Sequence, residues 1–148
     1  MSGIIGSTGS KSGVIGITEL DYEEGVWTPT LTSVGGEVSV AQADVGTYTK
    51  TGRLVSVQFY LSAATMTGAS GFMKVTGLPF APHNDQTISS SWSSHTMAFD
   101  TAKHISMVTN VASFFYWRQT TTGAAWGNMD ITSATIYLQA SATYQTSD

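Results

Sequence analysis

The chain has 148 residues and a mass of 15.7 kDa, which is the size of a single domain. Only 11% of its residues are charged and the formal net charge is −4, whereas 19 serines and 22 threonines make its polar residues mostly neutral. No window holds the clustered cations that a nucleic-acid backbone requires, no cysteine is present, and no apolar run is long enough for a signal peptide or a membrane span. We therefore expect neither nucleic-acid binding nor membrane insertion.

Residues 1–20 are rich in glycine and contain a short repeat, because residues 2–6 (SGIIG) recur as residues 12–16 (SGVIG). Glycine at this density disfavours regular helix. The repeat places two apolar pairs, Ile4 with Ile5 and Val14 with Ile15, on a polar tether. We predict that residues 1–26 form an extended anchor arm with an acidic linker, which orders when a partner buries the apolar pairs. The alternative is a flexible leader whose isoleucines fold back on their own domain.

From Trp27 onward the pattern changes to short β-like runs separated by turn residues. Residues 53–61 alternate most clearly, with Val55, Val57, Phe59 and Leu61 on one face. Many strands at a spacing of about ten residues are typical of a sandwich or jelly roll. We predict an all-β, jelly-roll-like antiparallel β-sandwich over residues 27–148, with Trp27, Val57, Phe59, Leu78 and Phe80 in its core. The other expected strands are 27–33, 36–42, 45–51, 71–77, 86–91, 95–99, 103–109, 111–118 and 129–140.

Residues 114–117 (FFYW) place bulky aromatic side chains on both faces of one strand. One face can enter the core, and the other must be covered by a loop, covered by another chain, or left exposed. The last strand alternates in a similar way, with Tyr137 opposite its apolar neighbours. We predict that these aromatic residues form subunit contacts: Phe114, Phe115, Tyr116, Trp117 and Tyr137. The alternative is that the strand is buried within a single sandwich.

The sequence lacks the common catalytic and metal-binding motifs. The spacings of His83, His95 and His104 fit no local zinc motif, no Gly-x-Ser-x-Gly turn occurs, and beyond residue 26 the acidic residues are scattered singly. We therefore predict no enzyme activity, no metal and no cofactor.

Two segments combine tryptophan with neutral hydroxyl and amide groups, which is a chemistry suited to sugars. They are residues 89–95 (SSSWSSH) and residues 120–128 (TTTGAAWGN). The candidate glycan contacts are Trp92, His95, Trp126 and Asn128. The alternative is that these tryptophans belong to the core or to an interface.

Four blocks of the sequence resemble, in their order and spacing, small structural modules of tailed phages of the marine and cyanophage type. They are residues 21–31 (DYEEGVWTPTL), 46–55 (GTYTKTGRLV), 75–80 (VTGLPF) and 140–144 (ASATY). The resemblance implies a β-sandwich head, often trimeric, at the end of a fibre or projecting from a virion. Two features depart from the usual pattern: Val26 replaces a threonine, and no shaft separates the leader from the head.

Composition and resemblance together predict a phage virion structural protein. We expect a short fibre knob or capsid decoration protein at the virion surface, a homotrimer that docks through residues 1–20 on other virion proteins and exposes a head for host-surface glycan. The virion anchor would be Ile4, Ile5, Val14 and Ile15. The alternatives are a small tailspike-like depolymerase or cell-wall hydrolase using acids such as Asp100 and Asp130, and a soluble lectin.

Overall fold

The computed structural model describes residues 21–35, 39–40, 45–84, 88–97, 102–130 and 134–147. Within these ranges the chain forms strands joined by turns and contains no helix. The strands are β1 (Tyr22–Trp27), β2 (Thr30–Ser33), β3 (Ser39–Val40), β4 (Gly46–Thr51), β5 (Leu54–Met66), β6 (Met73–Thr76), β7 (Ser89–His95), β8 (His104–Asn110), β9 (Phe114–Thr120), β10 (Gly127–Asn128) and β11 (Ala134–Gln145).

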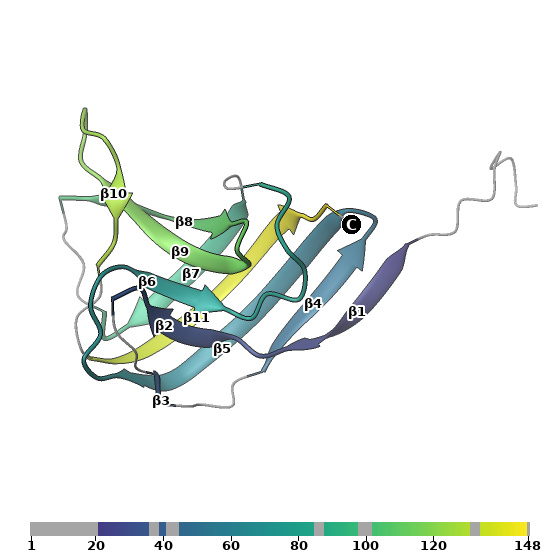
Figure 1. The fold of residues 1–148 in the computed structure, drawn as a ribbon, viewed down its shortest axis with the longest axis horizontal. Helices are drawn as coiled ribbons and strands as arrows, with labels where there is room; N and C mark the ends of the chain where they lie inside the picture. The colour runs from purple at the N-terminus through teal and green to yellow at the C-terminus, as the bar shows by residue number, and fades with distance from the viewer. Residues whose placement is uncertain are drawn as a thin grey trace, which may run out of the picture.

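The strands form two antiparallel sheets that pack face to face as a β-sandwich (Figure 1). In the larger sheet, sheet A, the order is β1-β4-β5-β11-β7, and β3 also pairs with β5. In the smaller sheet, sheet B, β8 pairs along the whole of β9, so β6 and β10 share the other edge of β9, and β2 lies beyond β6. The prediction of an all-β sandwich is confirmed.

The β5 strand shows why this sequence builds a two-layered fold. Its alternate residues Val55, Val57, Phe59 and Leu61 are buried, whereas the residues between them are exposed. A strand with one apolar and one polar face must cover its apolar face with a second layer. The alternation predicted for residues 53–61 is confirmed, and the strand continues to Met66.

The single strand expected over residues 27–33 is wrong. Trp27 ends β1 in sheet A, and Thr30 begins β2 in sheet B. Between them lies Pro29, which has no backbone N–H to donate to a ladder. The chain therefore changes sheets at residues 28–29.

Two strand boundaries near the end of the chain also differ from expectation. One strand, β7, runs from Ser89 to His95, where residues 86–91 and 95–99 were expected to form two strands. The strand expected over residues 129–140 is described as β11, which runs from Ala134 to Gln145. The serines of β7 do not mark it as a strand by their own propensity, and its pairing along β11 decides the outcome.

Strand β1 begins inside the segment expected to be an acidic linker. Tyr22 to Trp27 pair in register with β4. The Lys50 ammonium, which is buried, lies 2.8 Å from the Asp21 carboxylate, and the Tyr48 hydroxyl donates to Glu23 at 2.6 Å. These acidic residues therefore hold the first strand onto the sheet. The anchor candidates Ile4, Ile5, Val14 and Ile15 lie outside the described residues.

The core lies between the sheets and contains a chain of contacting aromatic rings. Trp27 meets Phe59 edge-on at 5.5 Å, Phe59 stacks on Phe115 at 6.2 Å, and Phe115 meets Tyr144 edge-on at 6.1 Å. Of the residues predicted for the core, Trp27, Val57, Phe59 and Leu78 are buried, and Phe80 is half-buried against them.

Because Tyr144 is buried, we expect the protein to lose stability at alkaline pH. Burial raises the pKa of this phenol above its usual value of 10.0, although its hydroxyl donates to the Phe80 carbonyl at 3.0 Å. Below pH 10 the phenol is neutral in both the folded and the unfolded chain. Above pH 10 only the unfolded chain ionises freely, so the free energy of unfolding should fall by up to about 1.4 kcal/mol per pH unit.

The variant Tyr144→Phe tests this expectation by urea unfolding between pH 8 and pH 11.5. It should lose about 1 kcal/mol at pH 8 through the missing hydrogen bond and show a flatter decline above pH 10. Tyr60→Phe, at an exposed position, should keep the wild-type slope. Equal slopes for wild type and Tyr144→Phe would contradict the account.

Candidate functional site

The outer face of sheet A is polar and uncharged over four neighbouring strands, β4, β5, β11 and β7. Successive residues of a strand point to opposite faces, so the residues between the buried positions of these strands face away from sheet B. Most of them carry hydroxyl or amide groups: Thr47, Thr49, Ser56, Gln58, Tyr60, Ser89, Ser91, Ser93, Gln139, Ser141 and Thr143.

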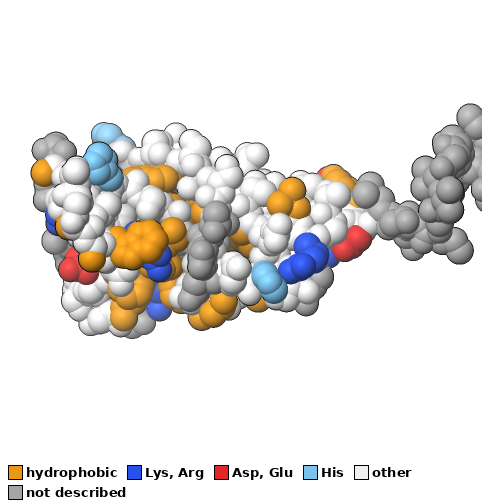
Figure 2. Space-filling view, turned by 90° about the horizontal axis from the view of Figure 1, so that it is seen from above, with side chains coloured by type: hydrophobic (Ala, Val, Ile, Leu, Met, Phe, Trp, Pro, Cys, Tyr) orange, Lys and Arg blue, Asp and Glu red, His pale blue; other side chains and the backbone are white. Residues whose placement is uncertain are grey.

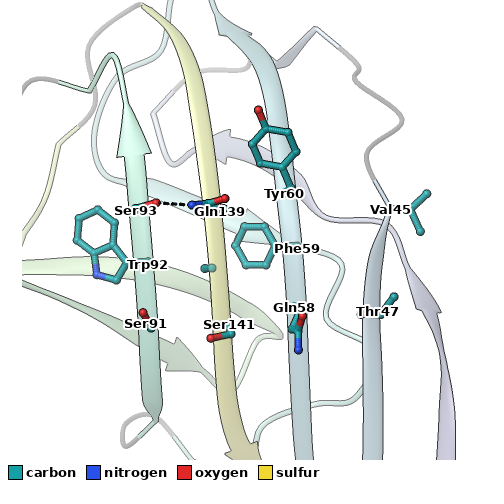
Figure 3. A pocket seen from close by; sticks show the side chains of 11 residues that line it. Val45, Thr47, Gln58, Phe59, Tyr60, Ser91, Trp92, Ser93, Gln139 and Ser141 are labelled. Atoms are coloured by element: carbon teal, nitrogen blue, oxygen red, sulfur yellow. Dashed lines mark hydrogen bonds between the residues drawn. The ribbon is translucent and has the colours of Figure 1, made fainter.

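The strand register arranges these residues in rows across the sheet. Gln58 lies opposite Thr47 on one side and opposite Ser141 on the other, and Ser141 lies opposite Ser91. In the next row Gln139 lies between Tyr60 and Ser93. Figure 3 shows the two rows, with side chains contributed by four neighbouring strands. Residues distant in sequence thus form one continuous surface.

A hollow of about 470 Å³ lies over these two rows. Phe59, Trp92 and Ala140 lie beneath it, because their side chains pack into the core. Its outward-facing lining residues are Val45, Thr47, Gln58, Tyr60, Ser91, Ser93, Gln139 and Ser141. We call this hollow and the two that adjoin it the sheet A groove.

The two adjoining hollows extend the groove along β11. One of about 310 Å³ shares Tyr60, Ser93 and Gln139 with the first and reaches His95 and Tyr137. The other, of about 360 Å³, shares Gln58, Ser91 and Ser141 and reaches Ser89 and Thr143. Strand β11, which lies between β5 and β7 in sheet A, therefore forms the floor of a groove that follows most of its length.

A bulge shapes the end of the groove at Tyr137. The register between β11 and β5 shifts between Ile136 and Leu138, and on β5 Ala63 has a φ of 55°. A bulge bends its strand and redirects the local side chains. Tyr137 lies here with its ring 5.6 Å from that of His95.

Several hydrogen-bonding groups of the groove are free. The Gln139 amide donates to the Ser93 hydroxyl at 2.8 Å (Figure 3). In the part of the chain that the structure describes, the side chains of Gln58, Tyr60, Ser91 and Ser141 have no hydrogen-bond partner. These groups can both donate and accept, and they are available to a ligand.

The aromatic run at residues 114–117 divides between the two faces of sheet B. Phe115 and Trp117 are fully buried in the core, where Trp117 meets Trp92 edge-on at 6.0 Å. They are therefore not available for the subunit contacts expected of them. The alternating geometry of a strand separates them from Phe114 and Tyr116, which lie on the outer face.

The outer face of sheet B carries aromatic rings interleaved with cations. The Lys74 ammonium lies 5.5 Å from the centre of the Phe114 ring. The Arg118 guanidinium lies 5.2 Å from the Tyr116 ring and 4.4 Å from the Trp126 ring. In Figure 2 hydrophobic and cationic side chains gather at the end of the molecule near β10. The Phe72 ring lies 5.7 Å from the Tyr116 ring. We call Phe72, Lys74, Phe114, Tyr116, Arg118 and Trp126 the sheet B cluster.

The predicted glycan contacts do not come together in the structure. His95 lies at the end of the sheet A groove, and Trp92 packs beneath it against Trp117. Trp126 and Asn128 belong to the region of β10 in sheet B. The groove residues Gln58, Tyr60 and Gln139 were missed, although the alternation of their strands marks them as the polar face.

The described residues contain no group of three or more histidines and acidic residues that could hold a metal ion. Asp130, one of the acids of the hydrolase alternative, is exposed next to Met129, and Asp100 lies outside the described residues. No helix in the described part of the chain is long and apolar enough to cross a membrane.

No family model, curated protein or solved structure matches the chain. A function must therefore be inferred from its own residues, their geometry and the four sequence blocks described above.

Proposed function

We propose that the protein is a bacteriophage virion structural protein, either a short fibre knob or a capsid decoration protein. In this role residues 1–20 dock on the particle, and the β-sandwich faces outward at the virion surface as an attachment head. The role requires binding and assembly but no catalytic step. The observation that supports it best is that the four phage-like sequence blocks meet in one structural unit.

Two of these blocks fit together through glycines on paired strands. Trp27 and Gly46 lie opposite each other in β1 and β4, as do Gly25 and Tyr48. A Cβ atom at Gly46 would lie 2.3 Å from the Trp27 indole nitrogen, so only glycine leaves room for this ring. The first block therefore depends on the second for its packing.

The remaining two blocks complete the same corner of the sandwich. Phe80 meets Tyr48 edge-on at 5.4 Å, and the Lys50 ammonium lies 5.5 Å from the centre of the Phe80 ring. The Phe80 carbonyl accepts from the Tyr144 hydroxyl. Because all four blocks contribute to this unit, their common occurrence has a physical reason.

We assign trimer contacts to the sheet B cluster, in which Trp126 and the half-buried Phe114 are the accessible rings. Tyr116 is only 6% exposed and packs against Phe114. Aromatic and arginine side chains are enriched at subunit interfaces, and Trp126 is 66% exposed in the single chain. The repeated crossing of the chain between the sheets supports jelly-roll-like connectivity. The neutral surface of Figure 2 also suits close packing of copies on a particle.

Purified particles of the encoding phage provide the test, with mass spectrometry measuring copies per particle. Wild-type protein should be present, and the fourfold change of Ile4, Ile5, Val14 and Ile15 to serine should lower incorporation at least tenfold. Changing Ser7 and Ser10 to alanine alters the same segment without removing the apolar pairs and should leave incorporation unchanged.

Two results would count against this proposal. Absence of the wild-type protein from particles would contradict the virion role and favour the soluble lectin. Equal incorporation of the fourfold variant would contradict the anchor at these four residues.

A further inference from the structure

We propose that the sheet A groove binds a neutral saccharide chain, with Tyr60 and Gln139 at the centre of the site. The inference deepens the proposed attachment role and rests on it for its biological purpose. Nothing in the geometry of the groove requires the particle, so binding can be measured on the purified full-length protein.

The absence of charge in the groove selects the class of ligand. None of the residues that line its three hollows is Asp, Glu, Lys or Arg. An anionic sugar would lose hydration on entering the groove without gaining a cationic partner. A neutral sugar offers hydroxyl groups that donate and accept, as do the side chains of Gln58, Ser91 and Ser141.

An exposed ring provides the apolar part of the recognition. Tyr60 is 49% exposed and projects beside Gln139 at the centre of the groove (Figure 3). The C–H face of a pyranose can pack on such a ring while its hydroxyl groups reach the neighbouring amides. Tyr137 and His95 offer a second pair of rings further along β11. A chain of several sugar units running along β11 would therefore meet rings and amides in succession.

The scaffold suits this type of binding. The residues lie on paired strands, so little backbone freedom remains to be lost on binding. The central hollow falls within the volume range of small-ligand sites, about 300–1,000 Å³. Each copy of an open groove of this kind binds its saccharide weakly. Several copies on one particle raise the overall affinity for a host surface through avidity.

The groove variants each have a matched control within sheet A. Tyr60→Ala removes the central ring, and Tyr22→Ala removes a tyrosine of similar exposure, 53%, on β1 outside the groove. Gln139→Ala removes the central amide, and Gln145→Ala makes the same change at the far end of β11, outside the lining residues. Circular dichroism and urea unfolding confirm that each variant is folded.

The experiment uses two readouts on the full-length protein. The first is binding to an array of neutral oligosaccharides built from hexoses and deoxyhexoses, with a matched set containing uronic or sialic acids. The second is the change in backbone amide shifts on titration with the best neutral oligosaccharide. We expect binding to the neutral set, shift changes on β5, β7 and β11, and at least a tenfold weakening in Tyr60→Ala and Gln139→Ala but not in the controls.

Three outcomes would overturn the inference. In the first, the protein binds no neutral oligosaccharide. In the second, it binds one, but Tyr60→Ala and Gln139→Ala leave the binding unchanged. In the third, it binds only acidic oligosaccharides and loses this binding in Arg118→Gln. The last would move the site to the sheet B cluster. None of them bears on whether the protein is incorporated into particles, so failure of this site and failure of the virion role are distinguishable.

Discussion

Replacing Trp117 with alanine is expected to lower the free energy of unfolding by about 3–5 kcal/mol. Trp117 is fully buried and packs against Trp92 from the opposite sheet. Its indole N–H has no acceptor among the described residues, so its contribution comes from apolar contact rather than from a hydrogen bond. Because a domain of this size is stable by only about 5–15 kcal/mol, the variant should lose a large part of its stability.

Urea unfolding at 25 °C measures this effect, and Trp126→Ala is the matched control. Trp126 is largely exposed, and within the described residues its ring meets the Arg118 guanidinium and no other ring, so its loss should cost about 1 kcal/mol or less. Trp117→Phe keeps most of the ring and should fall between the two. A loss below about 1 kcal/mol for Trp117→Ala would contradict the placement of this residue in the core.

Replacing Gly46 with alanine is expected to cost about 3 kcal/mol, at the upper end of overpacking effects. The new Cβ atom would lie 2.3, 2.6 and 2.8 Å from three atoms of the Trp27 ring. This ring cannot move easily, because it is buried and lies edge-on against Phe59. The variant must therefore displace a core side chain or separate β1 from β4.

The control for Gly46→Ala is Gly127→Ala, since a Cβ atom at Gly127 meets nothing within 4 Å. Its effect on the urea midpoint should stay within about 0.5 kcal/mol. The double variant Trp27→Leu/Gly46→Ala tests the cause directly. If the Trp27 ring is the obstacle, the double variant should lose less stability than the sum of the losses of the two single variants. Additive costs would place the obstacle elsewhere.

The sequence predicted the parts of the fold that follow from period-2 alternation. Val55, Val57 and Phe59 alternate with polar residues over a long run, which determines both the strand and its buried face. The exchange of sheets at Pro29 and the pairing of β7 with β11 were not predictable in this way, since they depend on which strands meet in three dimensions.

The neutral, hydroxyl-rich character of the candidate site follows from the sequence, whereas its position does not, and its binding of a sugar stays a prediction. Neutral hydroxyl groups with aromatic rings pointed to a sugar, and the search for tryptophan selected Trp92 and Trp126. The structure turns Trp92 inward because β7 packs this residue against Trp117. The groove depends instead on Gln58, Tyr60 and Gln139, which lie in neighbouring rows only because β5 and β11 pair in this register.

The two faces of the sandwich suit different tasks in the proposed particle. The sheet B cluster combines aromatic rings with Arg118, and both residue types are enriched at subunit interfaces. The sheet A groove offers free neutral groups to a ligand. Assembly through sheet B would leave each groove open to solvent. Repeated copies would then present several grooves at once.

The most direct test of the virion role is cryo-electron microscopy of particles made with and without the gene for this protein. We expect difference density the size of the sandwich at defined positions on the particle surface, with residues 1–20 toward the particle and the sheet A groove facing outward. Identical particles from the two preparations, with the protein found only in the surrounding lysate, would contradict it.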